Sequence, residues 1–232
     1  MIKAYYTATN GATANQSYMD IISNNMANVQ TEGFKKTKAE FSDLLYTNIR
    51  GAEGANTELK SGSGSKINKA DVIFTQGTPV RTGRDTDYAI MGEGFFAVQF
   101  EDEIMFTRGG AFQSTYLDDE KYLTYQGGYV LNKDEEPIII GSDEDTEPGI
   151  FGFENNGDLA QAGNNLFIIA NEDAEYALLE NTSAAQGFIE ASNVEISEEM
   201  VRLIQVQKAF QLNSTVIKTA DEIEQTINTL RG

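Results

Sequence analysis

The sequence predicts an α+β protein in which two long terminal helices flank a central, antiparallel β-rich body. Three observations support this prediction. Apolar residues recur every three or four positions near both ends of the chain, as they do in amphipathic and coiled-coil helices. Between the ends, short β-type runs alternate with glycine, asparagine and aspartate, which is typical of antiparallel strands joined by turns. A glycine- and serine-rich stretch, GAEGANTELKSGSGSK, separates the first helical pattern from the β region.

The first predicted helix carries apolar or small residues at alternating steps of three and four. This is the a/d spacing of a coiled coil, with Asn15 as its one polar member. An ordinary amphipathic helix packed on a domain core is the alternative, but the pattern persists for more than three heptads, which favours a coiled-coil seam. The predicted seam residues are Tyr5, Ala8, Ala12, Asn15, Met19, Ile22, Met26 and Val29.

Asparagines interrupt this helix near its end, in the stretch ISNNMANVQTEGFKK. Asparagine is a poor helix former because its amide competes for backbone hydrogen bonds, so a run of asparagines requires a reason. Asn24, Asn25 and Asn28 fall on one side of the helix beside the seam, and we expect their amides to bond to neighbouring subunits. Asn28 could instead simply terminate the helix. We expect Gly33 to end the segment and Phe34 to anchor the chain in the next domain.

The second predicted helix closes the chain. It follows the segment from Ser192 to Glu195, SNVE, which has the form of a capping box that opens helices. No glycine or proline interrupts the chain from there to Gly232, so we expect about 35 helical residues and a length of about 50 Å. The predicted contact residues are Asn193, Met200, Leu203, Val206, Phe210, Asn213, Ile217 and Ala220, and the apolar pattern also includes Ile196, Ile223, Ile227 and Leu230.

Short β-type runs occupy the middle of the chain. They read DYAIM, FFAVQF, EIMF, KYLTY, GYVLN, PIII, IFGF and NLFII, and FFAVQF-ED-EIMF suggests a hairpin. We therefore expect a helical assembly domain formed by residues 1–32 and 192–232, a connecting region at residues 33–70 and a β-rich body at residues 71–191. A body that receives and returns the chain at one place would send out both helices as an antiparallel, coiled-coil-like pair. Such a pair leaves apolar surface in water, so partners are implied.

Composition excludes several classes of function. The formal net charge is -19, and fifteen acidic residues between Glu101 and Asp158 face only three basic ones, which argues against nucleic acid and anionic membrane surfaces as partners. No run of about 18 apolar residues exists, so we expect no membrane insertion. The chain lacks histidine and cysteine, which removes the commonest catalytic bases, thiolate nucleophiles and transition-metal ligands. The N-terminal segment does not have the form of a secretory signal peptide, so we expect any export to use another route.

Two motifs suggest ligand sites, but each lacks the context that its chemistry requires. Gly92, Gly94 and Ala97 match the spacing of a dinucleotide fingerprint, yet the residues that follow alternate like a strand where a helix is needed. The segment from Asp143 to Glu154 places acidic residues like a calcium loop, but Pro148 occupies the position that must be glycine. An acidic, solvated loop is the favoured interpretation. We therefore expect no catalytic, cofactor-binding or metal-binding residues, and a protein that is not an enzyme.

The terminal motifs resemble those of the flagellar basal-body rod proteins, a family related to the flagellar hook protein. MDIISNNMANVQTEGFKKTKAEFSDLL is similar to the N-terminal signature A-N-N-L-A-N-x-x-T-x-G-F-K, with Ser23 and Met26 as mild departures. GFIEASNVEISEEMVRLIQVQKAFQLNSTVIKTADE is similar to the C-terminal signature around E-x-S-N-V and N-S-x-x-I-x-T-x-D. DYAIMGEGFFAVQ and FTRGGAF resemble the β core of rod-type proteins. The resemblance covers both ends and several central landmarks in order.

This resemblance implies a structural subunit of the bacterial flagellar rod, which joins the motor to the hook. It implies terminal helices packed in a tube of identical subunits, contact with other rod and hook subunits, and an extracytoplasmic location reached through the flagellar type III export apparatus without a cleavable signal. It leaves the choice between a proximal and a distal rod subtype open. Two alternatives from other classes remain: a secreted β-domain enzyme or ligand-binding protein oligomerised by its helices, and a calcium-stabilised, adhesin-like subunit.

Overall fold

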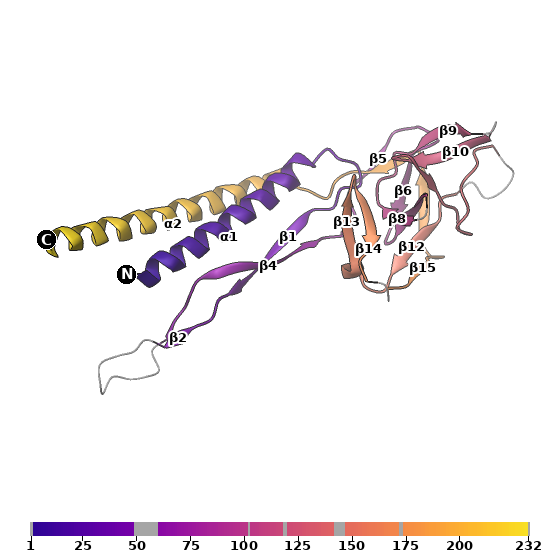
Figure 1. Ribbon diagram of the computed structural model, residues 1–232. Helices are drawn as coiled ribbons and strands as arrows, with labels where there is room; N and C mark the ends of the chain where they lie inside the picture. Colours follow the sequence, from indigo (N-terminus) through magenta and orange to yellow (C-terminus); the bar gives the residue numbers. More distant parts are fainter. Residues whose placement is uncertain are drawn as a thin grey trace. The chain divides into compact units, whose positions relative to one another are not determined.

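The computed structural model describes residues 2–48, 60–101, 103–117, 120–141, 147–171 and 174–231, and it is α+β as the sequence predicts (Figure 1). The chain forms two compact units. The helical unit contains Met1–Ala27, Thr37–Asp71 and Glu195–Gly232, and the β body contains Asn28–Lys36 and Val72–Val194. Neither helix in the described residues carries a stretch apolar enough to cross a membrane.

Two long helices dominate the helical unit. Helix α1 (Ile2–Ala27) has 26 residues and helix α2 (Ile196–Arg231) has 36, close to the length predicted for the C-terminal helix. They pack against each other and run in opposite directions (Figure 1). The predicted antiparallel helix pair is therefore confirmed. Helix α2 begins directly after the SNVE segment, although the Ser192 hydroxyl accepts a hydrogen bond from the Val194 amide, at 3.3 Å, and not from that of Glu195 as a capping box requires.

A two-stranded ladder completes the helical unit. It consists of β1 (Thr37–Asp43) and β4 (Ser65–Val72), and a shorter ladder joins β2 (Thr47–Asn48) to β3 (Lys60–Ser61). We call residues 37–48 and 60–71 the hairpin arm. These strands differ from the connecting region expected at residues 33–70, because β1 packs on α1 and shares the compact unit with both helices.

The β body is built around one nine-stranded sheet. Its main path runs β13-β14-β8-β7-β11-β10-β9, and β12 pairs with both β7 and β15. The strands are β7 (Phe95–Phe100), β8 (Glu103–Thr107), β9 (Gln113–Leu117), β10 (Glu120–Tyr125), β11 (Gly128–Val130), β12 (Ile150–Phe153), β13 (Leu159–Gly163), β14 (Leu166–Ile169) and β15 (Tyr176–Leu178). The predicted hairpin is confirmed, since β7 and β8 are antiparallel with Phe100 opposite Glu103.

Two smaller ladders accompany this sheet. In one, β6 (Tyr88–Met91) pairs with β16 (Ser183–Gln186), and in the other β5 (Pro79–Arg81) pairs with β17 (Phe188–Glu190). A short 3-10 helix, η1 (Asn156–Asp158), precedes β13. The run PIII, predicted as a strand, forms only isolated bridges, at Pro137 and Ile139. Of the predicted acidic loop from Asp143 to Glu154, residues 143–146 lie outside the described residues.

Strand β7 lies at the centre of the β body because both of its faces are buried. Phe96 and Val98 belong to one apolar cluster and Phe95 and Ala97 to the other. Each of these four side chains is at most 1% exposed. This explains why FFAVQF reads as a continuous apolar run, whereas a strand with one solvated face alternates. The Gly92, Gly94 and Ala97 motif leads into this strand and not into a helix, so it lacks the helix N-terminus that a dinucleotide site needs.

Replacing Phe96 with alanine should test the central position of β7. We expect Phe96→Ala to lower the free energy of unfolding of the β body by about 3–5 kcal/mol, because it opens a cavity in a fully buried cluster. Chemical denaturation followed by tyrosine fluorescence measures this change. Tyr116→Ala is the matched control, because Tyr116 is 72% exposed and its loss should change stability by less than about 0.5 kcal/mol. Equal effects of the two substitutions would contradict the assignment of the core.

Candidate assembly site

Most of the predicted seam positions are buried or partly buried in the helical unit, in which α1 and α2 pack against each other. Ala8, Ala12 and Ile22 of α1 and Val206 of α2 are buried. Tyr5 and Met200 stay exposed, at 43% and 49%. The remaining seam positions are partly buried: Asn15, Met19, Met26, Leu203, Phe210, Asn213, Ile217 and Ala220. Val29, the last predicted seam residue, is also partly buried but belongs to the β body.

A glycine permits close approach of the two helices at one point. An added Cβ on Gly11 would lie 2.8 Å from the Nδ2 atom of Asn213, which is too close for ordinary contact. The Asn213 side chain therefore packs directly over the backbone of α1 at Gly11. Gly11 was absent from the predicted seam, because glycine lowers helix propensity and carries no apolar side chain by which a periodic pattern could reveal it.

The second side of α1 is covered by the hairpin arm. The rings of Tyr18 and Phe41 meet edge to face with centroids 5.2 Å apart. The Asn10 amide donates to the Ser63 carbonyl at 3.0 Å, and the Lys3 ammonium donates to the Thr47 hydroxyl at 2.5 Å. Helix α1 is thus the middle layer of the helical unit, with α2 on one side and the hairpin arm on the other.

The asparagine at position 25 serves this internal contact. Its Nδ2 donates to the Thr37 carbonyl and its Oδ1 accepts from the Thr37 amide, both at 2.9 Å, and the residue is 1% exposed. The prediction that Asn25 bonds to a neighbouring subunit is therefore wrong, since its amide is already used within the chain and is not accessible. Asn24 is exposed. Asn28 accepts hydrogen bonds from the amide and the hydroxyl of Thr31, at 3.1 Å each, which agrees with its alternative interpretation as a terminator of the helix.

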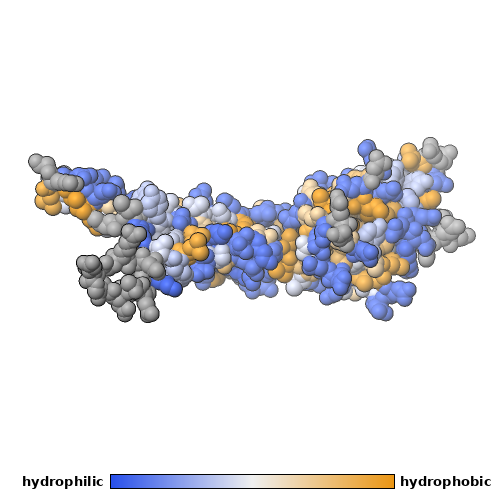
Figure 2. All heavy atoms as spheres, turned by 60° about the horizontal axis from the view of Figure 1, so that its bottom comes forward, coloured by the Kyte–Doolittle hydropathy of each residue, from blue (hydrophilic) through white to orange (hydrophobic). Residues whose placement is uncertain are grey.

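Helix α2 keeps a set of large apolar side chains at the surface. Each is between 42% and 83% exposed. Apolar residues also lie at the surface near the C-terminal end of α2, at the left of Figure 2. Exposed apolar stripes of this length mark sites where another macromolecule binds. The set comprises Val201, Ile204, Leu212, Val216, Ile223, Ile227 and Leu230.

Three chain segments of the β body, residues 28–36, 72–79 and 188–194, are tied together in what we call the junction. The Gly33 amide donates to the Glu190 carbonyl at 2.7 Å, and the Asn193 amide donates to the Phe34 carbonyl at 3.3 Å. Asn193 also binds through its side chain: Oδ1 accepts from the Lys36 amide, and Nδ2 donates to the Ile73 carbonyl, both at 2.7 Å. Asn193 therefore joins all three segments within one subunit.

Gly33 and Phe34 also have internal roles. Gly33 has a φ of +67°, and an added Cβ would lie 2.5 Å from the backbone of Arg108, so only glycine fits without displacement. Phe34 is 9% exposed and lies in the β body, where the sequence placed it as an anchor. Along with Asn193, these predicted interface residues lie in the junction and contribute contacts within the chain.

A buried ion cluster forms the centre of the junction. The Lys35 ammonium lies 2.5 Å from Oε1 of Glu190 and the Arg108 guanidinium lies 3.4 Å from Oε2. The Gly77 amide also donates to Oε1 at 2.6 Å, and Lys35 donates to the Thr75 carbonyl at 2.8 Å. All three charged side chains are at most 2% exposed. Burial lowers the pKa of Lys35 and that of Arg108, and the Glu190 carboxylate partly opposes both shifts.

Two of these charged residues occur in the terminal motifs, but the sequence analysis assigned them no role. Lys35 follows Gly33 and Phe34, and Glu190 lies two positions before the SNV segment. They are 155 positions apart, so their pairing could not be read from spacing. The sequence contains one indication of burial: each of the two charged residues directly follows an apolar residue of its motif.

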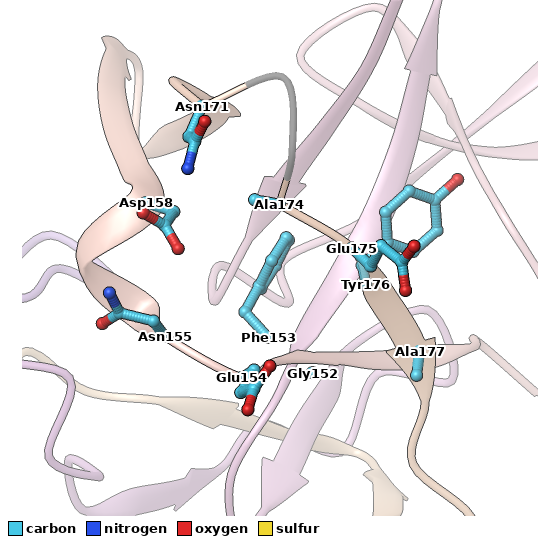
Figure 3. A pocket seen from close by; sticks show the side chains of 10 residues that line it. All are labelled: Gly152, Phe153, Glu154, Asn155, Asp158, Asn171, Ala174, Glu175, Tyr176 and Ala177. Carbon is cyan, nitrogen blue, oxygen red and sulfur yellow. The ribbon is translucent and has the colours of Figure 1, made fainter.

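The β body also contains a hollow of about 460 Å³ near the end of β12. Figure 3 shows the Phe153 ring rising in its middle, with Asp158 on one side and Glu175 on the other. Asn155 and Asn171 contribute amides to its rim. The polar groups are spread around an aromatic side chain and do not meet at one point. Within the described residues, no group of three or more carboxylates is placed to hold a metal ion.

Comparison with known proteins finds similarity along the whole chain. A family model described as flagella basal body rod protein matches residues 6–35, and the flagellar basal body rod FlgEFG protein C-terminal model matches residues 185–230. The flagellar hook protein FlgE/F/G D1 domain model matches residues 89–199. The matches coincide with α1 and the start of the junction, with α2, and with most of the β body.

Curated relatives match over their full length. The flagellar basal-body rod protein FlgG of Borreliella burgdorferi is 34% identical, with 100% of this chain and 99% of the relative covered. The FlgG of Bacillus subtilis is 32% identical with 100% of both covered, and that of Buchnera aphidicola from Acyrthosiphon pisum is 33% identical with 99% and 100% covered. The flagellar hook protein FlgE of Treponema pallidum is 36% identical over 48% of this chain and 26% of the relative.

The asparagine contact between α1 and the hairpin arm gives a first prediction for this site. Asn25→Ala should lower the free energy of unfolding of the helical unit by about 1–3 kcal/mol, because both backbone groups of Thr37 lose their amide partner. Asn24→Ala, at the exposed neighbouring position, should have a smaller effect. Hydrogen exchange at the amide of Thr37 distinguishes the two variants, and equal exchange in both would contradict the internal role of Asn25.

The buried ion cluster gives a second prediction. Glu190→Gln should destabilise the β body by about 3–5 kcal/mol, because the shape is kept while two buried cations lose their counter-charge. Thermal unfolding measures the loss. Glu180→Gln, which neutralises an exposed carboxylate on the same body, is the control. If the triple variant Lys35→Met, Arg108→Met and Glu190→Leu, which removes all three buried charges, recovers most of the stability, the cost arises from unpaired charge and not from lost packing.

Proposed function

Because the chain belongs to the family of flagellar basal-body rod proteins, we propose that it is a structural subunit of the rod that self-assembles through its terminal helices into a helical tube. In this role it transmits motor torque to the hook and performs no catalysis. The observation that carries the proposal is similarity over the full length to rod proteins of several bacteria. The exposed apolar residues of α2 support it, because a chain that works alone has no use for them.

The physical basis of such a tube is a contact between unlike surfaces. When one surface of a subunit binds a different surface of the next subunit, each contact adds the same rotation. If these rotations do not close into a ring, the subunits form an open helical array. Burying the exposed stripe of α2 would offset the entropy lost when helices are ordered in the tube. We propose Tyr5, Met200 and the exposed apolar residues of α2 as interface residues, because their side chains remain exposed in the single chain.

We further propose that other rod subunits and the hook are neighbours of this protein. The local similarity to a flagellar hook protein supports a shared mode of packing at the end of the rod. Family membership also supports export by the flagellar type III apparatus and an extracytoplasmic place in the basal body.

Deletion of residues 2–27 tests this proposal in the source bacterium. We expect loss of motility and of the protein from isolated basal bodies, because α2 loses the seam against which it packs. Circular dichroism of the purified variant should still show the β signal of the body, since the nine-stranded sheet lies in the other compact unit. Normal rods built from the shortened chain would contradict self-assembly through the helices.

A further inference from the structure

Helix α2 continues past the point at which α1 begins. Gly11 of α1 lies opposite Asn213 of α2. Because the helices are antiparallel, a residue nine positions before Gly11 lies at the same height as the residue nine positions after Asn213. Ile2, the first described residue of α1, therefore lies at the level of Glu222. Residues 221–230 are all exposed, and Figure 1 shows the C-terminal end of α2 projecting beyond the start of α1. We call residues 221–230 the overhang.

The overhang has the chemistry of a contact surface. Ile223, Ile227 and Leu230 follow at i, i+4 and i+7, which places them in one stripe, and they are 42%, 44% and 83% exposed. Glu222 and Glu224 flank the stripe on either side, and the overhang contains no lysine or arginine. It therefore presents an apolar stripe with an acidic border.

The hairpin arm offers the complementary surface at the same end of the helical unit. Leu45 and Tyr46 are 86% and 60% exposed, although they lie in a folded segment. The hydrogen bond from Lys3 to Thr47 holds this part of the arm beside the first turn of α1. Lys60 and Lys66 are exposed on the same arm, and so is the acidic Asp43. In a chain with a net charge of -19, this is an apolar pair near which, among the described residues, exposed lysines outnumber the one exposed aspartate, Asp43.

On the premise of the proposed rod function, we propose that the overhang of one copy docks on the Leu45 and Tyr46 surface of a second copy. Apolar residues meet apolar residues, and the acidic border of the overhang meets the lysines of the arm. Since both surfaces lie at the same end of the helical unit, two copies standing side by side can present them to each other. In a bound pair, the first copy still has a free arm and the second copy still has a free overhang. Each can bind a further copy, so the contact repeats along the assembly.

The natural absence of cysteine permits a direct test. Two full-length chains, one with Leu45→Cys and one with Leu230→Cys, are expressed together in the source bacterium, and isolated basal bodies are oxidised. We expect disulfide-linked dimers that contain one copy of each variant. The control pairs Leu230→Cys with Tyr116→Cys, whose position on β9 is also exposed, at 72%. The experimental pair should link at least about fivefold more than the control pair.

A charge reversal gives a second measurement. Glu222→Lys with Glu224→Lys on the chain that carries Leu230→Cys should reduce the linked dimer, and Lys60→Glu with Lys66→Glu on the other chain should restore it. The same reversal at Glu154 and Glu180 of the β body should leave the yield unchanged.

Three outcomes decide the matter. Preferential linkage with rescue by the paired reversal supports the proposal. If basal bodies contain both variants but yield no more linked dimer than the control pair, the proposed contact is wrong and the rod function stands. The same holds if the chain with Leu230→Cys links to a different flagellar protein. Absence of the unmodified chain from basal bodies overturns the rod function and this contact together.

Discussion

The structure depends on one buried carboxylate. Glu190 lies between Lys35 and Arg108, out of contact with water, and also accepts a hydrogen bond from the Gly77 amide. Removing three charges from water is costly, and the cluster is tolerated only because each charge has a partner. Since Lys35 lies eight residues after α1 and Glu190 six residues before α2, the cluster fixes the two segments that connect the β body to the helices. Both connections therefore start from one place.

The residues that define the terminal motifs serve mostly this internal purpose. Gly33 allows the backbone to approach Arg108, and Asn193 joins three segments through its amide. A rod subunit must bind its neighbours and also maintain its own fold. In this chain the polar motif residues make contacts within each unit, and the exposed apolar residues of α2 remain for the neighbours. The polar residues thus specify the fold of one subunit, and the apolar residues supply the affinity between subunits.

Sequence reasoning succeeded where the cause of structure is local. The periods of α1 and α2, the β7-β8 hairpin and the α+β class follow from side-chain spacing over a few residues. It failed for β1 and β4, because only Ala39 of β1 is buried and the arm is held by α1 rather than by its own apolar pattern. It also failed for Asn25 and for the pair of Lys35 and Glu190, whose partners are backbone groups or distant residues that no spacing reveals.

The contact of Asn25 has a consequence for the chemical ageing of the protein. Its side chain both donates to and accepts from the backbone of Thr37, so neither a carboxylate nor an apolar isostere can reproduce the pair. Deamidation of Asn25 to aspartate would replace a single nitrogen with oxygen. An attraction to the Thr37 carbonyl would become repulsion between two oxygens inside the helical unit. The helical backbone and the burial around Asn25 disfavour the cyclisation that deamidation requires, so the fold protects the amide on which the attachment of the hairpin arm depends.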